Sequence, residues 1–335
     1  MSISQKLHRI LIAGAATSLL AFAANISAAQ AYQLAGTSGL ASDAYWISLM
    51  CGGTKAAKAA GSKLDWYAVK NGSDAAEANA NYEALKVAKP DGVVLSQFST
   101  EPPAGYVKEL MDAGIPVVYV NGQPAKDRSY LTGYRSAPAN NKMEEVAAKI
   151  IADTGGKGVM AITGGLPGLG EGLDSRWNIL KKILKDKAPG LEILDTQYDS
   201  FDANKTNDVV SATIVANPKL NVVYTVSGPE GEGAVAAVKA AGKAGSIMIY
   251  SFDAVPALQD ALRAGTVKAL IAQPPALQGG EAVKKLVAFL DKHKKGEAIQ
   301  PDASNQDQQI DTMVITKDNI DKPEAQGYLY KATCE

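Results

Sequence analysis

Short apolar runs rich in Val, Ile and Leu alternate along the chain with longer segments whose apolar residues recur at helical spacing. The short runs include "DGVVLSQF", "IPVVYVNG", "KGVMAITG", "NVVYTVSG" and "SIMIYSFD", and the segments between them include "AGYVKELMDAG" and "EGAVAAVKAAGKAG". Continuous apolar runs of strand length indicate strands buried on both faces, and regular alternation with helices is typical of parallel βαβ units. The pattern therefore predicts an α/β fold built on parallel sheets.

The alternation falls into two series, which predicts two domains. The first series runs from about Tyr32 to Tyr134, and the second starts again at "KGVMAITG" and ends near Gln273. The segments "GYRSAPANN" and "AQPPALQGG" contain turn-forming residues without a strong period, so they are expected to cross between the domains. A third crossover is expected after the charged segment "KKGEAIQPDASNQDQQ". We expect a first domain of 32–136 plus 275–308, a second of 137–274 plus 309–317, and a tail of 318–335.

The overall charge excludes one class of partner. Lys and Arg number 34 against 35 acidic residues in a chain of 335 residues, so no net field attracts nucleic acid or an anionic membrane. The function is therefore expected to depend on a local site, with no nucleic-acid partner.

The N-terminus has the three parts of a secretory signal peptide. Lys6, His8 and Arg9 precede the apolar run 10–24, and the small residues of "AQA" follow at 29–31. About 15 apolar residues are fewer than the roughly 20 that a membrane span needs. We therefore expect export, with cleavage after Ala31 and residues 1–31 removed.

Export changes the interpretation of the two cysteines, Cys51 and Cys334. Oxidising compartments favour pairing, so we expect a disulfide that ties the tail to an early helix; two separate thiols are the alternative. The only histidines are His8 and His293, and no CxxC motif occurs, so no metal site is expected.

Polar residues stand where the predicted strands end. In open parallel sheets, ligands bind outside the carboxyl ends of the strands. Most of the polar groups at these ends are neutral hydrogen-bonding groups, accompanied by one carboxylate, which favours a polyhydroxylated ligand over a phosphate or an acid. The residues that end the runs are Ser38, Ser96, Gln97, Asn121, Thr163, Tyr198, Ser227, Asp253 and Gln273.

The segment "TGGLPGLG" has the TGxxxGxG spacing of a dinucleotide-binding turn, with glycines at 164, 168 and 170. A short-chain dehydrogenase would also need a YxxxK motif downstream, but Tyr82 and Lys86 form this motif before the turn. Glycines also allow positive φ and close approach of a helix, so we favour a structural turn and expect no cofactor. A secreted NAD(P)-dependent oxidoreductase is the alternative.

Several segments in register resemble periplasmic sugar-binding proteins of the ribose-binding type, the substrate receptors of ABC importers. The segment "SGLASDAYWISLMCGGTKAAKAAG" resembles the first strand, loop and helix of that family, with Asp43 at a polar sugar ligand and Tyr45 and Trp46 at two stacking aromatics. The segments "IYSFDAVP" and "LIAQPP" keep the Phe-Asp and Gln of the family, and "SRWNILKKIL" carries its helix-borne Arg. The resemblance covers the mature chain to about Thr316.

Other positions depart from the family pattern. Asn121 and Gly122 replace an expected Asp-Arg pair, Ser96 replaces an Asn, and Ser227 with Gly228 replaces Asn-Asp. Since serines reach less far than amides and the charged pair is missing, the pocket is expected to differ from one shaped for ribose. It could accept a larger ring, a polyol or a modified sugar.

The resemblance implies a type I periplasmic binding protein, with two Rossmann-like doubly wound domains joined by a three-crossover hinge. It implies aromatic walls from Tyr45, Trp46, Phe201 and Phe252 and polar contacts from the remaining positions. The alternatives are core packing for Phe201 and Phe252, a surface ion pair for Arg176, a helix cap for Asp43 and a hinge hydrogen bond for Gln273. The full expected ligand-binding set is Asp43, Tyr45, Trp46, Ser96, Asn121, Arg176, Phe201, Ser227, Asp253 and Gln273.

The implied function is capture of a sugar or polyol in the periplasm and its delivery to a membrane ABC permease, by a monomer without enzymatic activity. A sugar sensor for a membrane receptor would share the same pocket. A glycoside hydrolase would need two facing carboxylates, for which Asp43 and Asp253 are the only candidates identified.

Overall fold

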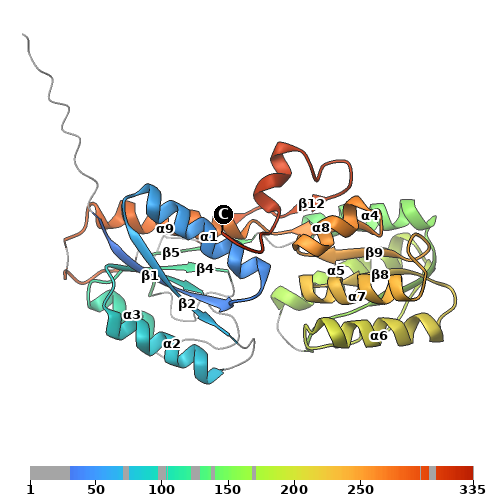
Figure 1. Ribbon diagram of the computed structural model, residues 1–335, viewed down its shortest axis with the longest axis horizontal. Coiled ribbons are helices and arrows are strands. Elements are labelled where there is room, and N and C mark those ends of the chain that lie inside the picture. The colour runs from blue at the N-terminus through green and yellow to red at the C-terminus, as the bar shows by residue number, and fades with distance from the viewer. Residues whose placement is uncertain are drawn as a thin grey trace, which may run out of the picture.

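The computed structural model describes residues 31–70, 75–96, 103, 105–121, 129–136, 140–167, 171–294, 296–301 and 307–334. The expected signal peptide up to Gln30 lies outside the described residues, as do Gln97, Gly122, Gly168 and Gly170. Two six-stranded sheets organise the described residues into two domains that lie side by side (Figure 1). The prediction of two α/β domains is confirmed.

The first domain contains a sheet in which all pairings are parallel, in the order β11-β5-β4-β3-β1-β2. Its strands are β1 (Gln33–Leu40), β2 (Lys63–Val69), β3 (Gly92–Ser96), β4 (Val117–Val120), β5 (Thr132–Ser136) and β11 (Gln308–Ile310). Its helices are α1 (Ala44–Ala59), α2 (Ala75–Ala88), α3 (Tyr106–Asp112) and α9 (Pro275–Leu290). Every residue of β3 and β4 is buried, as expected for central strands covered on both faces.

The second domain contains a sheet of order β12-β10-β9-β8-β6-β7, parallel except where β12 runs antiparallel to β10. Its strands are β6 (Lys157–Ile162), β7 (Gly190–Ile193), β8 (Leu220–Thr225), β9 (Met248–Phe252), β10 (Val267–Ala272) and β12 (Met313–Ile315). Its helices are α4 (Asn140–Thr154), α5 (Glu171–Lys187), α6 (Ala203–Ala216), α7 (Gly228–Ala240) and α8 (Pro256–Arg263).

The chain passes between the sheets three times. The crossovers follow β5, β10 and β11. The third differs in detail from the expected position, because the expected division after residue 308 falls inside β11, which pairs with β5 of the first sheet. The chain changes sheet at Asp311 and Thr312 instead. Strand β11 could not be recognised in the sequence, because it has only three residues and two of them are polar.

Helices α1 and α9 cross at very short range beside the crossovers. A Cβ atom on Gly52 would lie 1.9 Å from the carbonyl oxygen of Ala276, and one on Gly279 would lie 2.2 Å from that of Leu49. Only glycine permits these backbones to approach so closely. The crossing therefore fixes the start of α9, which follows the second crossover directly, against the first helix of the chain.

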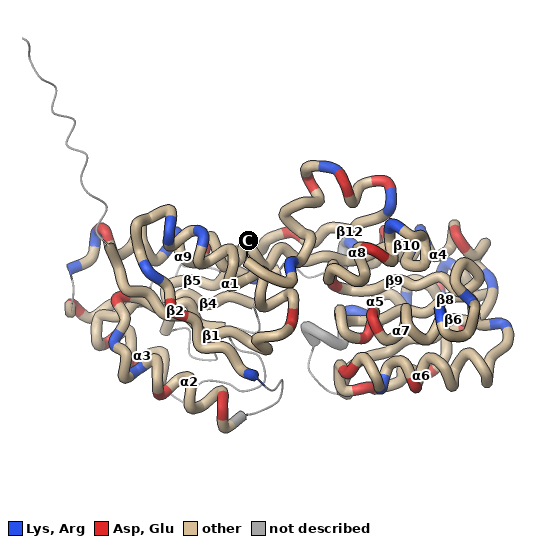
Figure 2. The backbone as a smooth tube through the Cα atoms, viewed as in Figure 1, with Lys and Arg blue, Asp and Glu red and all other residues tan. Residues whose placement is uncertain are grey.

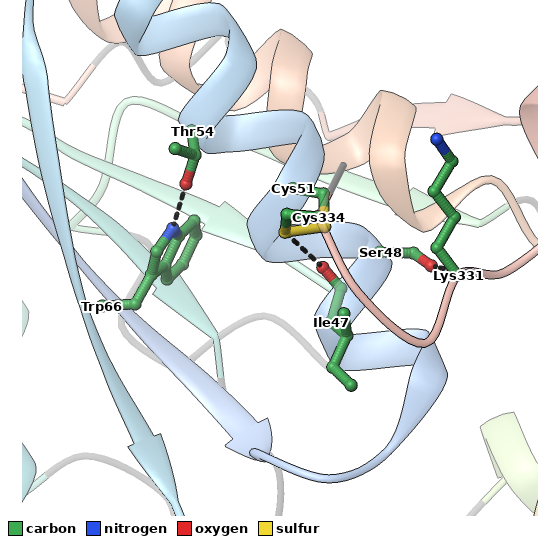
Figure 3. Close-up of a disulfide and its surroundings, with 7 residues drawn as sticks. All are labelled: Ile47, Ser48, Cys51, Thr54, Trp66, Lys331 and Cys334. Carbon is green, nitrogen blue, oxygen red and sulfur yellow. Dashed lines mark hydrogen bonds between the residues drawn. A yellow bond between two sulfur atoms is a disulfide. The ribbon is translucent and has the colours of Figure 1, made fainter.

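The C-terminal tail returns from the second domain to the first (Figure 1). After β12 it forms the 3-10 helix η1 (Pro323–Tyr328), whose Ala325 is fully buried. It then reaches α1, where Cys334 forms a disulfide with Cys51 across 283 residues of sequence (Figure 3). The predicted disulfide is confirmed.

Charged residues of both signs lie on both domains (Figure 2). This distribution agrees with the near-zero net charge of the chain. Among the described helices, none combines the length and apolar character needed to cross a membrane.

Candidate ligand-binding site

The centre of the candidate site is Asp253, directly after β9. Its backbone has a φ of 67°, a left-handed conformation that Asp adopts more readily than most residues. Its Oδ1 accepts hydrogen bonds from Tyr330 Oη (2.9 Å) and Gln273 Nε2 (3.2 Å), and its Oδ2 accepts one from the Gly228 N–H (3.1 Å). The side chain is thus a fixed acceptor at the carboxyl end of a central strand, with 8% of the residue exposed.

A chain of side-chain hydrogen bonds connects Asp253 to the first domain. Gln273 Oε1 accepts from Ser136 Oγ (2.9 Å), and Ser136 Oγ accepts from Gln278 Nε2 (2.7 Å). Gln278 Oε1 accepts from Tyr45 Oη (2.8 Å) on α1. We call Tyr45, Gln278, Ser136, Gln273 and Asp253 the hinge relay, because Ser136 and Gln273 stand at the first two crossovers.

Two members of the hinge relay were missed in the sequence. Ser136 lies in the crossover segment "GYRSAPANN", and Gln278 lies in α9 beside the paired glycines of "LQGG". A fully buried Gln in a helix needs hydrogen-bond partners, but the sequence alone gave no indication that Gln278 is buried. Gln273 has the hinge hydrogen bond that was considered as its alternative role, and it also contacts Asp253.

Arg176 on α5 connects the second domain's helix layer to the end of β9. Its guanidinium carbon lies 4.3 Å from the centre of the buried Phe252 ring, and its Nη1 donates to the Val226 carbonyl oxygen (2.7 Å). Because the guanidinium has five N–H donors, these contacts leave others for a ligand. Phe252 itself is 1% exposed, so its ring supports Arg176 from within the core.

Phe201 lies against the glycine turn that resembles a dinucleotide site. Its backbone is left-handed, with a φ of 58°, and its N–H donates to Asp199 Oδ1 (3.1 Å). A Cβ atom on Gly165 would lie 2.2 Å from the Phe201 ring. The glycine at 165 therefore makes room for an aromatic side chain, whereas the motif glycines at 168 and 170 lie outside the described residues, so the structural interpretation of the turn stays a prediction.

The same turn is held by a buried carboxyl group. Glu230, in the first turn of α7, is fully buried and accepts from the Gly165 N–H (2.8 Å) and the Val226 N–H (3.2 Å). Burial, the charge of Asp199 and a hydrogen bond to Asp199 raise the pKa of Glu230 well above its usual range. The Gly165 amide is thus bound to a carboxyl group, and a phosphate would compete with it. Glu230 could not be recognised from the sequence, because a Glu in the first turn of a helix is common and does not indicate burial.

Asp43 caps α1 and lies near the site. Its Oδ1 accepts from the Tyr45 N–H (2.9 Å), which is the helix-cap role considered for it. Burial raises the pKa of Asp43 to about 6, with further contributions from the negative charges of Asp253 and Glu232, while the hydrogen bond from Tyr45 opposes the shift. The charge of Asp253 therefore acts on Asp43 across the two domains.

The two expected stacking aromatics of the first domain are buried. Tyr45 packs edge-on against Trp46, with ring centres 5.0 Å apart, and against Tyr330 at 5.6 Å. Trp46 is 3% exposed and covers Gly39, where a Cβ atom would lie 2.2 Å from the indole. The structure therefore brings Tyr45 into the hinge relay and Trp46 against the end of β1.

The remaining expected residues occupy strand ends. Ser96 Oγ donates to the Thr37 carbonyl oxygen (2.6 Å), which joins the ends of β3 and β1. Asn121, half-buried after β4, has a φ of 53°, and its N–H donates to the Tyr134 carbonyl oxygen (3.0 Å). Ser227 precedes α7 and makes no side-chain cap hydrogen bond.

Two other strand-end hydroxyls, those of Ser38 and Thr163, are buried among the described residues without a hydrogen-bond partner. Thr163 directly follows β6, and Ser38 lies within β1, two residues before that strand ends. Within the described residues, no group of three or more His, Cys, Asp or Glu side chains is arranged to hold a metal ion. Among the described residues, the side chains expected at the site comprise hydroxyls, amides, the fixed carboxylate of Asp253, the guanidinium of Arg176 and the half-buried ring of Phe201.

Comparison with known proteins shows to which family this chain belongs. The sequence model of the periplasmic binding protein domain matches residues 37–295. A D-allose-binding periplasmic protein of Escherichia coli is 25% identical over 282 residues, which cover 82% of this chain and 89% of that protein. A ribose import binding protein of Salmonella typhimurium is 26% identical over 259 residues, which cover 76% of this chain and 82% of that protein.

A solved structure shows the same two-domain architecture. An ABC transporter solute-binding protein of Agrobacterium vitis, bound with α-D-tagatopyranose, matches with a TM-score of 0.73 and 26% identity and covers 90% of this chain and 99% of that one. The domain match spans most of this chain, and the fold agrees with the type I architecture expected from the sequence. The chain therefore belongs to the periplasmic binding protein family.

Proposed function

We propose that the protein captures a monosaccharide or polyol between its two domains in the periplasm and presents it to an ABC permease. The observation that carries the proposal is the fixed carboxylate of Asp253, connected through the hinge relay to both domains. A ligand that binds Asp253 would contact the element that joins the domains. Its binding would then favour one hinge state over another, which is how a receptor signals occupancy to a transporter.

The chemistry of the site suits hydroxyl groups. A sugar hydroxyl both donates and accepts, so it can donate to a carboxylate and accept from a guanidinium, and such charge-assisted hydrogen bonds are the stronger kind. Asp253 and Arg176 supply these two groups from the second domain. Half-buried Phe201 offers a ring on which the C–H face of a sugar would stack.

The relatives support the same chemical class. The proteins with 25–26% identity bind, by their names, D-allose, ribose and tagatopyranose, all monosaccharides. Asn121, Ser96 and Ser227 replace larger or charged groups of the ribose-type pattern, so we expect a preference that differs from ribose. We also expect a monomer that performs no catalytic step and a mature chain that begins at Tyr32.

A thermal-shift screen of the chain from Tyr32 to Glu335 tests the proposal. The panel contains pentoses, hexoses, polyols and amino acids, with NADH and NADPH as controls. A ligand present at about 1,000 times its dissociation constant stabilises the folded state by roughly 4 kcal/mol, a shift of several degrees at this size. A shift with a sugar or polyol is the expected result. A shift with a nicotinamide cofactor alone would overturn the proposal in favour of the oxidoreductase alternative.

A further inference from the structure

One residue of the C-terminal tail, Tyr330, lies at the centre of the candidate site. The match to the family domain ends at residue 295, and the tail lies beyond it. Tyr330 is nevertheless 3% exposed, and its hydroxyl donates to Asp253 Oδ1 at 2.9 Å. The same hydroxyl oxygen accepts from the Gln273 N–H at 3.3 Å. One tail side chain therefore contacts both residues of the second domain that belong to the hinge relay.

The backbone of Tyr330 is fixed on the second domain. Its N–H donates to the Ala254 carbonyl oxygen (3.0 Å), and its carbonyl oxygen accepts from Gln259 Nε2 (2.9 Å). Ala254 is the neighbour of Asp253 in the chain, so the tail is bonded to the same turn by backbone and by side chain. The position of the hydroxyl is therefore set by hydrogen bonds at both ends of the residue.

The next residues fix the tail on the first domain. The Lys331 N–H donates to Ser48 Oγ (2.8 Å) on α1, and Cys334 is bonded to Cys51 one turn further along that helix (Figure 3). The Tyr330 ring also packs edge-on against Tyr45 of α1. Tyr330 thus lies where the tail passes from one domain to the other.

The hydrogen bonds of Asp253 indicate what Tyr330 does. A carboxylate has about four acceptor positions, two on each oxygen. Tyr330 and Gln273 occupy both positions on Oδ1, whereas Oδ2 accepts a single hydrogen bond from the described part of the chain, donated by the Gly228 N–H. We propose that Tyr330 is a positioning residue that occupies Oδ1 of Asp253 and leaves Oδ2 as the oxygen that accepts a ligand hydroxyl. This inference rests on the proposed function, because it assigns the ligand to Asp253.

The tyrosine is suited to this role at all ordinary pH values. Burial and the negative charge of Asp253 raise the pKa of Tyr330 well above its usual value of 10. The hydroxyl consequently stays protonated and remains a donor to the carboxylate. A phenylalanine at this position would keep the ring and its packing against Tyr45 but would release one position on Oδ1.

The first test compares Tyr330→Phe with Tyr328→Phe, a matched change of a half-buried tail tyrosine two residues earlier. Each variant is titrated by calorimetry with the pentose, hexose or polyol of the thermal-shift panel that stabilises the unchanged protein most. We expect Tyr330→Phe to weaken binding about tenfold, the scale of one hydrogen bond to a charged group, and Tyr328→Phe to change it less than about twofold. Equal affinities for Tyr330→Phe and the unchanged protein would overturn the inference.

The second test needs no sugar and separates positioning from general support of the fold. Thermal unfolding is measured for Tyr330→Phe, Asp253→Gly and the double variant; glycine is chosen because it accepts the left-handed backbone at 253. We expect the loss of stability in the double variant to differ from the sum of the losses in the two single variants, because residues in contact are coupled. A loss in the double variant equal to that sum would overturn the inference. If the unchanged protein binds no pentose, hexose or polyol of the thermal-shift panel, the proposed function and the ligand role of Tyr330 both fail, while this coupling still decides whether the hydroxyl holds Asp253.

Discussion

Arg176 and Phe252 form a cation–π pair, with the guanidinium carbon 4.3 Å from the ring centre. Phe252 is the residue before Asp253, so the pair connects α5 to the turn that carries the fixed carboxylate. The cation lies over the face of the ring, whose negative charge distribution attracts it. The arrangement holds a guanidinium against the residue that directly precedes the fixed carboxylate.

Replacing Arg176 with Lys should weaken sugar binding while the domain stays folded. The lysine ammonium keeps the charge but cannot reproduce the stacked plane and the forked donors of a guanidinium. Loss of a cation–π contact and one hydrogen bond predicts a decrease in affinity of about tenfold or more. Calorimetric titration measures the change, with Arg263→Lys on α8 as the control, since Arg263 pairs only with exposed Asp260 and Asp321 among its described ion pairs. An unchanged affinity in Arg176→Lys would place the guanidinium outside the site.

Asp43 should make stability depend on pH between about 4 and about 6. Its pKa is raised to about 6 in the folded protein, above its value of 3.8 in an unfolded chain. Between these values the folded state holds more protons than the unfolded state, so the free energy of unfolding falls as pH rises through this window. Asp43→Asn should remove this part of the slope and keep α1 capped, because Asn is an equally good cap.

Urea unfolding at several pH values measures the effect of Asp43→Asn. The matched control is Asp65→Asn, which changes an exposed carboxylate on β2. Parallel pH profiles for Asp43→Asn and the unchanged protein would show that the carboxyl group at 43 does not titrate in this range.

The Cys51–Cys334 disulfide should stabilise the protein mainly by restricting the unfolded chain. It closes a loop across 283 residues, and long loops gain the most in the chain-entropy account. Replacing both cysteines with serine should lower the free energy of unfolding by about 2–5 kcal/mol, measured by urea unfolding under oxidising conditions. Reducing agent should lower the stability of the unchanged protein by a similar amount and leave the double variant unaffected. Equal stability of the two oxidised proteins would contradict this expectation.

The fold could be predicted because buried parallel strands leave a simple pattern. Runs such as "GVVLS" and "VVYV" are apolar at every position because both faces of β3 and β4 are covered, and the sequence shows this directly. No strand was predicted at β11, because a three-residue edge strand with two glutamines has no such pattern. Its position depends on pairing with β5, which only the tertiary structure reveals.

The candidate site was predicted less completely, for a related reason. Asp253 was identified because a carboxylate directly after a buried strand stands at the ligand-binding edge of a parallel sheet. Tyr330, Gln278 and Glu230 are brought to the site by long-range packing: Tyr330 lies 77 residues from Asp253 in sequence. No local pattern marks such residues. The hydrogen bond from the Tyr45 hydroxyl to Gln278 in the hinge relay was not foreseen, and stacking of Tyr45 on a ligand stays a prediction.

The central claim is that Asp253 binds a sugar or polyol, and calorimetric titration of the unchanged protein and Asp253→Asn tests it most directly. Asn tolerates the left-handed backbone and keeps the shape of the side chain, but it places an amide N–H₂ where one carboxylate oxygen accepts. The account predicts one-to-one binding of a sugar or polyol by the unchanged protein and an affinity at least about tenfold weaker in Asp253→Asn, the scale of a lost charge-assisted hydrogen bond. Binding of equal strength by the two proteins would contradict the account.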